Sequence, residues 1–203
     1  MEKKHKAGFV NIIGNPNVGK STLMNAFVGE KLSIITSKAQ TTRHRILGIV
    51  NGDDFQVILS DTPGIIKPAY ELQSSMMDFV KSAFEDADVL IYMVEVGEKE
   101  LKNEAFFNKI IHSKIPVILL LNKIDTSNQD DVQEKLDYWK EKVPNARTTF
   151  QHQHQKLATP LPSATRTVLL LWLHQAGCSL QLHFKLLPRN HRVLRRTHLP
   201  NDV

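Results

Sequence analysis

The chain has 203 residues, of which 41% are hydrophobic and 23% are charged, as in ordinary globular proteins. A single cysteine, Cys178, excludes an internal disulfide framework. No apolar stretch approaches the roughly 20 residues that a transmembrane helix needs, and we interpret the short apolar run at 9–13 as a buried strand instead of a signal peptide.

The net charge of +5 is unevenly distributed along the chain. Residues 1–143 contain 18 Lys and Arg against 20 Asp and Glu, whereas residues 144–203 contain eight Lys and Arg against one acid, Asp202. Six of the nine histidines also lie in the second segment. This change in composition indicates that the domain formed by the first segment does not continue far beyond residue 143.

Apolar runs alternate with amphipathic stretches over residues 1–143, a pattern typical of βαβ units. The predicted strands are 9–13, 46–51, 55–60, 89–94 and 116–121, and the predicted helices are 21–28, 70–84, 100–112 and 130–142. Residues 52–54 read Gly-Asp-Asp and predict a hairpin between the second and third strands. The expected fold class is therefore α/β, with a mostly parallel sheet flanked by helices.

The first strand is followed by Gly-Asn-Pro-Asn-Val-Gly-Lys-Ser, which matches G-x-x-x-x-G-K-[ST] at every position. The motif lies between a strand and a helix, where backbone amides and the helix N-terminus can surround phosphate oxygens. Lys20 is expected to bind the β- and γ-phosphates and Ser21 to bind Mg²⁺; the alternative is a chance glycine turn. The expected nucleotide contacts here are Gly14, Asn15, Pro16, Asn17, Val18, Gly19, Lys20, Ser21 and Thr22.

Two polar segments follow at the spacing of nucleotide-sensing loops. Asp61-Thr62-Pro63-Gly64 comes after the third strand. Asp61 is expected to hold Mg²⁺ through its water shell, and the Gly64 amide to contact the γ-phosphate. Thr41 and Thr42 lie between the two motifs, and we favour Thr42 as a ligand of Mg²⁺ and of the γ-phosphate. The alternative for either threonine is a solvated loop.

Asn122-Lys123-Ile124-Asp125 follows the last apolar strand. The Asp125 carboxylate can accept both the N1–H and the N2–H₂ of guanine, whereas adenine presents an acceptor at N1. Asn122 can bond the other polar edge of the base and brace the loops, and the stem of Lys123 can cover one ring face. A mismatched base would leave a polar group unpaired, at a cost of roughly 1–3 kcal/mol. This motif therefore indicates GTP over ATP.

With these motifs the sequence resembles the bacterial Era family of ribosome-assembly GTPases over about residues 6–143. The resemblance rests on GNPNVGKST, KAQTTRHRILGIV, DTPGI and NKID, and KAQTTRHR is its most family-specific string. It implies a Ras-like P-loop NTPase fold, GTP hydrolysis with catalytic roles for Lys20, Thr42 and Gly64, and a cytoplasmic protein that can associate with the inner membrane surface. Era-like proteins also carry a KH domain that binds the 3′ region of 16S rRNA in the small ribosomal subunit.

Two residues bear on the rate of hydrolysis. Ile65 stands where Ras-type enzymes carry a glutamine that orients the attacking water, so slow intrinsic turnover is expected. Asn17 matches an asparagine that helps bind K⁺ in similar GTPases; the alternative is a loop residue that bonds its own backbone.

The resemblance stops near Pro144. The expected Ser-Ala turn would fall near residues 151–153, where the sequence is Gln-His-Gln, and Ser163-Ala164 comes about ten residues late. We therefore expect the sheet to lack a normal last strand and the fold to lack its last helix. One glycine, Gly177, in the tail excludes the Gly-x-x-Gly loop of a KH domain.

The sequence thus predicts a GTPase domain over residues 1–146 and an unassigned basic tail over residues 147–203. The tail is interpreted as aberrant sequence, as a basic RNA-contacting segment with Arg189, Arg192, Arg195 and Arg196, or as a novel small domain. For function, two alternatives to an Era-like switch stay open. One is a nucleotide-binding fragment with little GTPase or RNA-binding activity, and the other is a related GTPase of tRNA modification or ribosome maturation.

Overall fold

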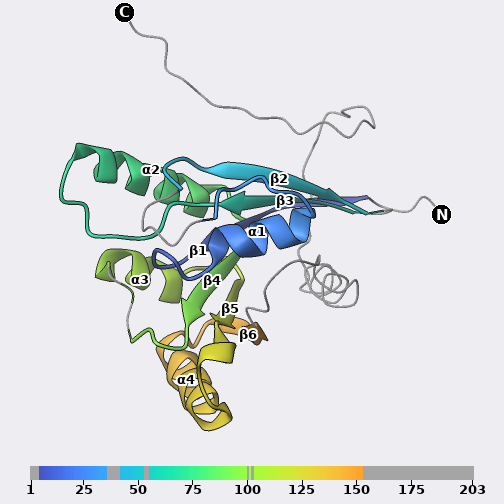
Figure 1. Cartoon of the computed structure of the whole chain (residues 1–203). Coiled ribbons are helices and arrows are strands. Elements are labelled where there is room, and N and C mark those ends of the chain that lie inside the picture. The colour runs from blue at the N-terminus through green and yellow to red at the C-terminus, as the bar shows by residue number, and fades with distance from the viewer. Residues whose placement is uncertain (1–4, 36–41, 53–54, 100, 102, 153–203) are drawn as a thin grey trace, which may run out of the picture.

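A computed structural model describes residues 5–35, 42–52, 55–99, 101 and 103–152 of the chain. These residues form a six-stranded sheet in the order β2-β3-β1-β4-β5-β6, flanked by helices (Figure 1). The strands are β1 (Lys6–Ile13), β2 (Ile46–Asn51), β3 (Phe55–Asp61), β4 (Val89–Glu95), β5 (Val117–Asn122) and β6 (Ala146–His152). The helices are α1 (Lys20–Val28), α2 (Glu71–Glu85), α3 (Glu104–Ile111), the short 3-10 turn η1 (Ile124–Thr126) and α4 (Gln129–Lys142).

Every neighbouring pair of strands is parallel except β2 and β3, which form the predicted antiparallel hairpin. In the parallel part, Ile12 pairs with Asp61 and Glu95 pairs with Asn122. The carboxyl ends of β1, β3, β4 and β5 therefore meet at one edge of the sheet. In open α/β sheets this edge is where ligands bind.

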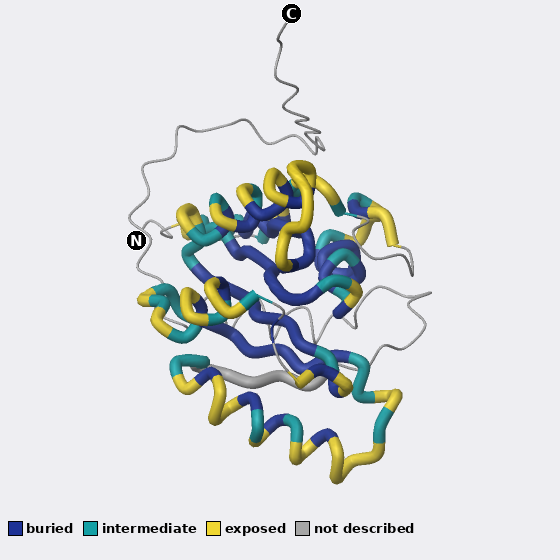
Figure 2. Tube along the Cα trace, turned by 90° about the vertical axis from the view of Figure 1, so that its left-hand side faces the viewer, coloured by how far each residue is buried: buried dark blue, intermediate teal, exposed yellow. Residues whose placement is uncertain are grey.

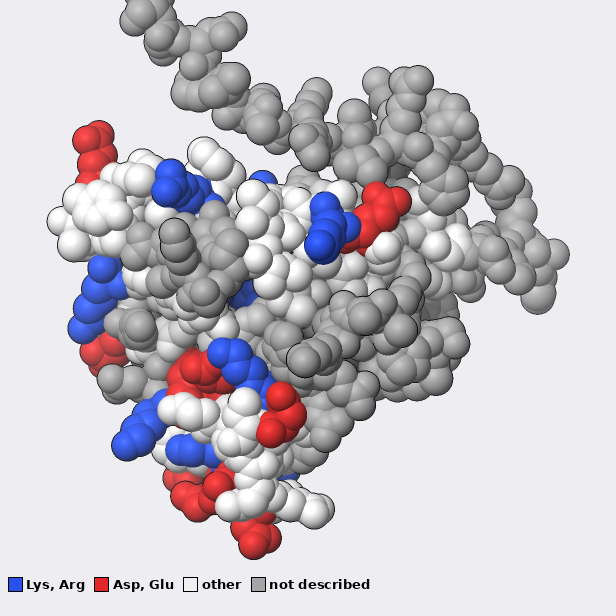
Figure 3. Space-filling model, in the orientation of Figure 1, with Lys and Arg blue, Asp and Glu red and all other residues white. Residues whose placement is uncertain are grey.

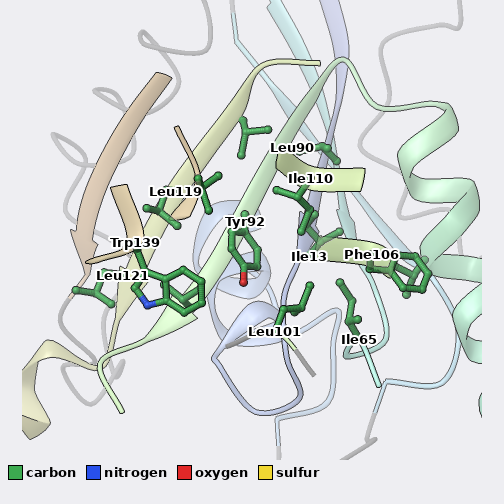
Figure 4. Close-up of a cluster of buried hydrophobic side chains, with 14 of the residues drawn as sticks. Ile13, Ile65, Leu90, Tyr92, Leu101, Phe106, Ile110, Leu119, Leu121 and Trp139 are labelled. Carbon is green, nitrogen blue, oxygen red and sulfur yellow. The ribbon is translucent and has the colours of Figure 1, made fainter. Parts of the chain in front are cut away.

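Two hydrophobic clusters cover the two faces of the sheet. Helices α2, α3 and α4 pack on one face, where Tyr92 and Trp139 meet edge to face with their ring centroids 5.8 Å apart (Figure 4). Helix α1 packs on the other face through Leu23, Met24 and Phe27. Figure 2 shows the central strands largely buried, with exposed residues on the outer sides of the helices, whereas the edge strand β2 alternates buried with exposed residues. The central strands are thus buried on both sides, as their near-continuous apolar runs predict.

The expectation that the sheet lacks its last strand is wrong. β6 covers Ala146–His152 and pairs in parallel with β5, from Val117 with Ala146 to Asn122 with His152. Strand pairing uses main-chain groups, and an edge strand needs fewer apolar side chains than a central one, so the sequence Ala-Arg-Thr-Thr-Phe-Gln-His suffices. The strand crosses the domain boundary expected at residue 146. The last helix and the Ser163-Ala164 pair fall outside the described residues.

Helix α3 begins four residues later than its apolar pattern predicts. The Asn103 side chain accepts a hydrogen bond from the backbone N–H of Phe106, so the helix starts at Glu104. Asn128 caps α4 in the same way through Asp131. Among the helices that the structure describes, none has the length and apolar character needed to cross a membrane.

Candidate functional site

The sequence motifs come together at the carboxyl edge of the sheet, because they lie at or just after the ends of parallel strands. Residues 14–19 join β1 to α1, Asp61 ends β3, and Asn122 ends β5. Thr42 precedes β2 and approaches the same edge, because its hydroxyl lies near the Ser21 hydroxyl and the Asp61 carboxylate. Thr41 lies outside the described residues.

Residues 14–19, called the phosphate-binding loop after their predicted role, curl tightly around the start of α1. Gly19 has a φ of 106°, and a Cβ at this position would lie 2.4 Å from the Asn122 amide nitrogen, so only glycine fits without rearrangement. Gly19 also precedes a helix whose N-terminus has no side-chain cap, which leaves its N–H groups open to a phosphate. Asn17 has a left-handed φ of 64°, and Thr22 is buried in the first turn of α1.

Lys20 points into this loop. Its Nζ donates to the carbonyl oxygens of Gly14 at 3.2 Å and Asn15 at 2.7 Å, and the side chain is buried. Burial lowers the pKa of Lys20 to about 8, against the opposite effect of the Asp61 and Glu98 carboxylates. A bound phosphate would add negative charge beside the ammonium group and so favour its charged form.

The three residues expected at Mg²⁺ form one cluster of oxygen atoms. Ser21 Oγ donates to Asp61 Oδ2 at 2.7 Å, Thr42 Oγ1 lies 3.4 Å from the same oxygen, and the two hydroxyl oxygens are 3.2 Å apart. The other carboxylate oxygen, Asp61 Oδ1, is buried and has no hydrogen-bond partner among the described residues. Burial raises the pKa of Asp61, against the opposite effect of the Ser21 hydrogen bond and the Lys20 charge, and a bound cation would favour the charged carboxylate further. Hydroxyl and carboxylate oxygens are ligands that Mg²⁺ prefers, and the cluster fits this ion.

The segment after β3 packs directly on the phosphate-binding loop. A Cβ at Gly64 would lie 2.6 Å from the Cα of Pro16, so glycine allows the two backbones to touch. The Ile65 amide donates to the Gly14 carbonyl at 3.0 Å. Thr62 donates to the Ile12 carbonyl at 2.7 Å, and Pro63 beside it is buried. A displacement of either segment therefore displaces the other.

Ile65 itself is a core residue. Its side chain is 0% exposed and packs in the cluster with Ile13, Leu101 and Phe106 (Figure 4). Because the side chain at this position points into the core, it takes no part in orienting a water molecule at the phosphates.

The residues expected at the base lie beside the phosphate-binding loop. Asn122 is buried, and its Nδ2 donates to the Val18 carbonyl at 2.7 Å, which ties the end of β5 to the loop. Lys123 has a left-handed φ of 58°, and its ammonium group is ion-paired with Glu95. Asp125 lies in η1 and is exposed, within reach of a ligand from solution.

One residue of the site was missed in the sequence. Glu98 is buried, accepts a hydrogen bond from Asn15 Nδ2 at 2.5 Å, and accepts another from the Glu95 amide at 3.3 Å. Burial raises the pKa of Glu98 to about 7. The available indication was its position: an acid just beyond a fully apolar strand, at the edge where the other motifs lie.

Comparison with known proteins places this geometry in a family. Residues 9–123 match the model of the 50S ribosome-binding GTPase family. The chain belongs to this family. Over 135 residues it is 45% identical to GTPase Era of Clostridium beijerinckii, an alignment that covers 66% of this chain and 45% of that protein. The resemblance to Era-type GTPases is therefore confirmed.

Two solved Era structures show the same fold as this GTPase-family chain. The structure of Era with MgGDPNP and nucleotides 1506–1542 of 16S ribosomal RNA superposes with a TM-score of 0.73 at 35% identity, and covers 91% of this chain and 60% of that one. An Aquifex aeolicus Era variant bound to GDP and AlF₄⁻ gives 0.70 at 37% identity, with 81% and 56% covered. The chain thus spans about half the length of these relatives.

Proposed function

We propose that this protein binds GTP and GDP together with Mg²⁺ and hydrolyses GTP to GDP and phosphate as a conformational switch. The observation that supports this most directly is the convergence of Ser21 and Thr42 on one oxygen of Asp61, with the other oxygen buried and lacking a partner among the described residues. Lys20 lies beside them in the phosphate-binding loop. Lys20 and the oxygen cluster together offer one positive group and several oxygen ligands where a nucleoside triphosphate and its metal ion would bind.

The residues of the site have separate roles in nucleotide binding and hydrolysis. Lys20 exchanges its two carbonyl partners for phosphate oxygens, and the loop amides surround the β-phosphate. Ser21, Thr42 and Asp61 would hold Mg²⁺, which neutralises charge on the phosphate oxygens when bound. The Gly64 amide would contact the γ-phosphate. With Ile65 in the core, the attacking water must be oriented by backbone or by a partner, so intrinsic turnover is slow.

Asn122, Lys123 and Asp125 would select guanine. Asp125 accepts from N1–H and N2–H₂ of the base. Asn122 bonds the other polar edge of the base and also holds the phosphate-binding loop through the Val18 carbonyl. We also propose that K⁺ binds at Asn17 and stabilises the developing charge. The alternative, a nucleotide-binding fragment with little turnover, differs from this proposal in the rate of hydrolysis and not in binding.

Single-turnover GTP hydrolysis by the full chain, with Mg²⁺ and K⁺, is the test. Lys20→Ala should abolish hydrolysis, since no other described cation occupies the loop, whereas Lys81→Ala on the exposed side of α2 should match the wild type. GDP binding without hydrolysis by the wild type would support the nucleotide-binding fragment. Absence of binding to either nucleotide would refute the proposal altogether.

We assign nucleotide binding to residues 1–152, extended from residue 146 because β6 belongs to the same sheet. A chain that ends after residue 152 should bind GDP as tightly as the full chain in a calorimetric titration. Binding by the full chain alone would mean that residues 153–203 complete the nucleotide-binding unit.

The resemblance to Era further supports a role with the small ribosomal subunit and its 16S rRNA, in the cytoplasm and with peripheral association at the inner membrane. Charged side chains of both signs are interspersed over the α3–α4 side in Figure 3, and the basic excess of the chain falls in residues 144–203. We therefore propose that RNA contacts use Arg189, Arg192, Arg195 and Arg196. Replacing all four with glutamine should weaken binding to a 16S rRNA fragment and reduce its salt dependence; unchanged binding would contradict the assignment.

A further inference from the structure

The family-specific string at residues 38–45 ends in Arg45, a residue to which nucleotide binding gives no role. Arg45 immediately precedes β2 and follows Thr42 by three positions. Its side chain is 13% exposed, which is low for a charged residue. A guanidinium group withdrawn this far from water needs partners for its donors.

Arg45 reaches three separate elements of the fold. Its Nε donates to Ser60 Oγ in β3 at 2.6 Å, and one Nη donates to Asn11 Oδ1 in β1 at 3.0 Å. Both Nη atoms bind the carboxylate of Asp86, which is the C-cap of α2. Asn11 closes the network, because its Nδ2 donates to Asp86 Oδ1 at 2.9 Å and to the Ala83 carbonyl. This bidentate geometry is specific to arginine.

The network joins the two segments that are expected to respond to the γ-phosphate. On one side, the chain runs from Arg45 back to Thr42 at the proposed metal site. On the other, the Asp61–Gly64 turn leads into α2 (Figure 1), and Asp86 caps the far end of that helix. Ser60, which Arg45 also binds, is the residue before Asp61. One guanidinium group therefore fixes the end of the threonine segment to both β3 and α2.

We infer that Arg45 is a positioning residue that couples the Thr42 segment to helix α2 through Asp86. This inference rests on the proposed function, since it assumes that GTP orders the Thr42 segment. Because two hydrogen bonds join the Arg45 guanidinium to the Asp86 carboxylate, a displacement of the Thr42 segment also displaces the end of α2. Arg45 touches none of the nucleotide-binding residues in the described network, so its loss leaves the nucleotide site itself intact.

The test compares Arg45→Lys and Asp86→Asn with Lys81→Ala in the full chain. Lys81 forms an exposed ion pair with Asp78 on the same helix, with a distance of 2.7 Å, so it controls for the loss of a surface charge on α2. Arg45→Lys keeps the charge but not the fork. The Asp86 side chain is 43% exposed, so Asp86→Asn is expected to fold even if Arg45→Lys does not.

The decisive measurement is hydrogen–deuterium exchange of the α2 amides with GDP and with a non-hydrolysable GTP analogue. In the wild type and Lys81→Ala, exchange should differ between the two nucleotides. In Arg45→Lys and Asp86→Asn the difference should shrink at least about threefold, with GDP affinity within about twofold of the wild type and single-turnover hydrolysis about tenfold slower. A merely structural role would lower the melting temperature without changing the nucleotide-dependent difference.

Two results would overturn the inference. One is an undiminished difference at α2 in both network variants, and the other is a wild-type α2 that exchanges equally with either nucleotide. If the wild type binds and hydrolyses GTP in those cases, the coupling alone fails. If the wild type binds no GTP, the proposed function fails with it, so the two failures are distinguishable.

Discussion

Replacing Glu98 with glutamine should make the nucleotide-free protein more stable, by an amount that grows with pH. Glu98 is buried behind the phosphate-binding loop, where Asn15 and the Glu95 amide donate to it. Burial, the largest cause, raises the pKa of Glu98 from 4.5 to about 7. The Glu95 carboxylate also raises it, whereas the hydrogen bonds from the Glu95 amide and Asn15 and the charge of Lys20 lower it. Burial raises the pKa of the neighbouring Tyr92, and the Glu98 carboxylate raises it further.

The direction in which stability changes with pH follows from the number of protons bound by the folded and unfolded protein. Between pH 4.5 and about 7 the folded protein holds a proton on Glu98 that the unfolded chain has released, so stability falls as the pH rises through this window. The destabilisation by the ionised Glu98 carboxylate is small below pH 4.5 and complete above about 7. At about 1.4 kcal/mol for each pKa unit, the ionised carboxylate destabilises the fold by about 3 kcal/mol. Glutamine keeps an acceptor for Asn15 and removes the charge.

Urea unfolding of the two proteins at several pH values between 5 and 8 provides the assay, with bound nucleotide removed first. The stability advantage of Glu98→Gln should rise across the window and reach about 3 kcal/mol at pH 8. Asp78→Asn, in an exposed ion pair, should differ from the wild type by no more than about 0.5 kcal/mol. An advantage of Glu98→Gln that stays constant with pH would refute the reasoning.

Three further predictions concern the nucleotide site. Gly64→Ala should weaken GTP binding about tenfold or more, because overpacking against the Pro16 backbone costs about 1–3 kcal/mol; equal affinity in an equilibrium titration would show that the loops can separate freely. Asp125→Asn should lower GDP affinity by a similar factor while leaving the melting temperature of the nucleotide-free protein unchanged, since the side chain is exposed; retained affinity in calorimetry would remove Asp125 from the base site. Replacing Na⁺ with K⁺ should accelerate single-turnover hydrolysis by the wild type but not by Asn17→Gly, a change that keeps the left-handed backbone. Equal wild-type rates in the two salts would argue against a K⁺ site.

The central fold and the grouping of motifs could be predicted because their determinants are local. Apolar strands and a glycine-rich turn before α1 place Lys20 and Ser21 at the sheet edge, and the parallel topology brings Asp61 and Asn122 to the same edge. β6 was missed because its pairing with β5 depends on main-chain groups and not on a side-chain pattern.

Contacts between residues far apart in the sequence could not be predicted in this way. Glu98 and Asn15 meet only because β4 and β1 are neighbours in the sheet. Arg45 and Asp86 are separated by 41 positions and meet because β3, β1 and α2 bring them together. No spacing rule within a single segment marks such pairs, although each is built from residue types that need a partner when buried.

The burial of Ile65 restricts how this protein could evolve or be engineered toward faster turnover. A glutamine at this position would have to place its amide in the apolar cluster or pull the segment away from it, and burial of an unpaired amide costs about 1–3 kcal/mol in proteins. The segment is also fixed by the Ile65 amide to Gly14, so it cannot swing outward without disturbing the phosphate-binding loop. A single substitution therefore does not convert this site to the Ras-type arrangement. Acceleration is more accessible through a group supplied from outside the chain, which would leave the lifetime of the GTP-bound state under the control of a partner.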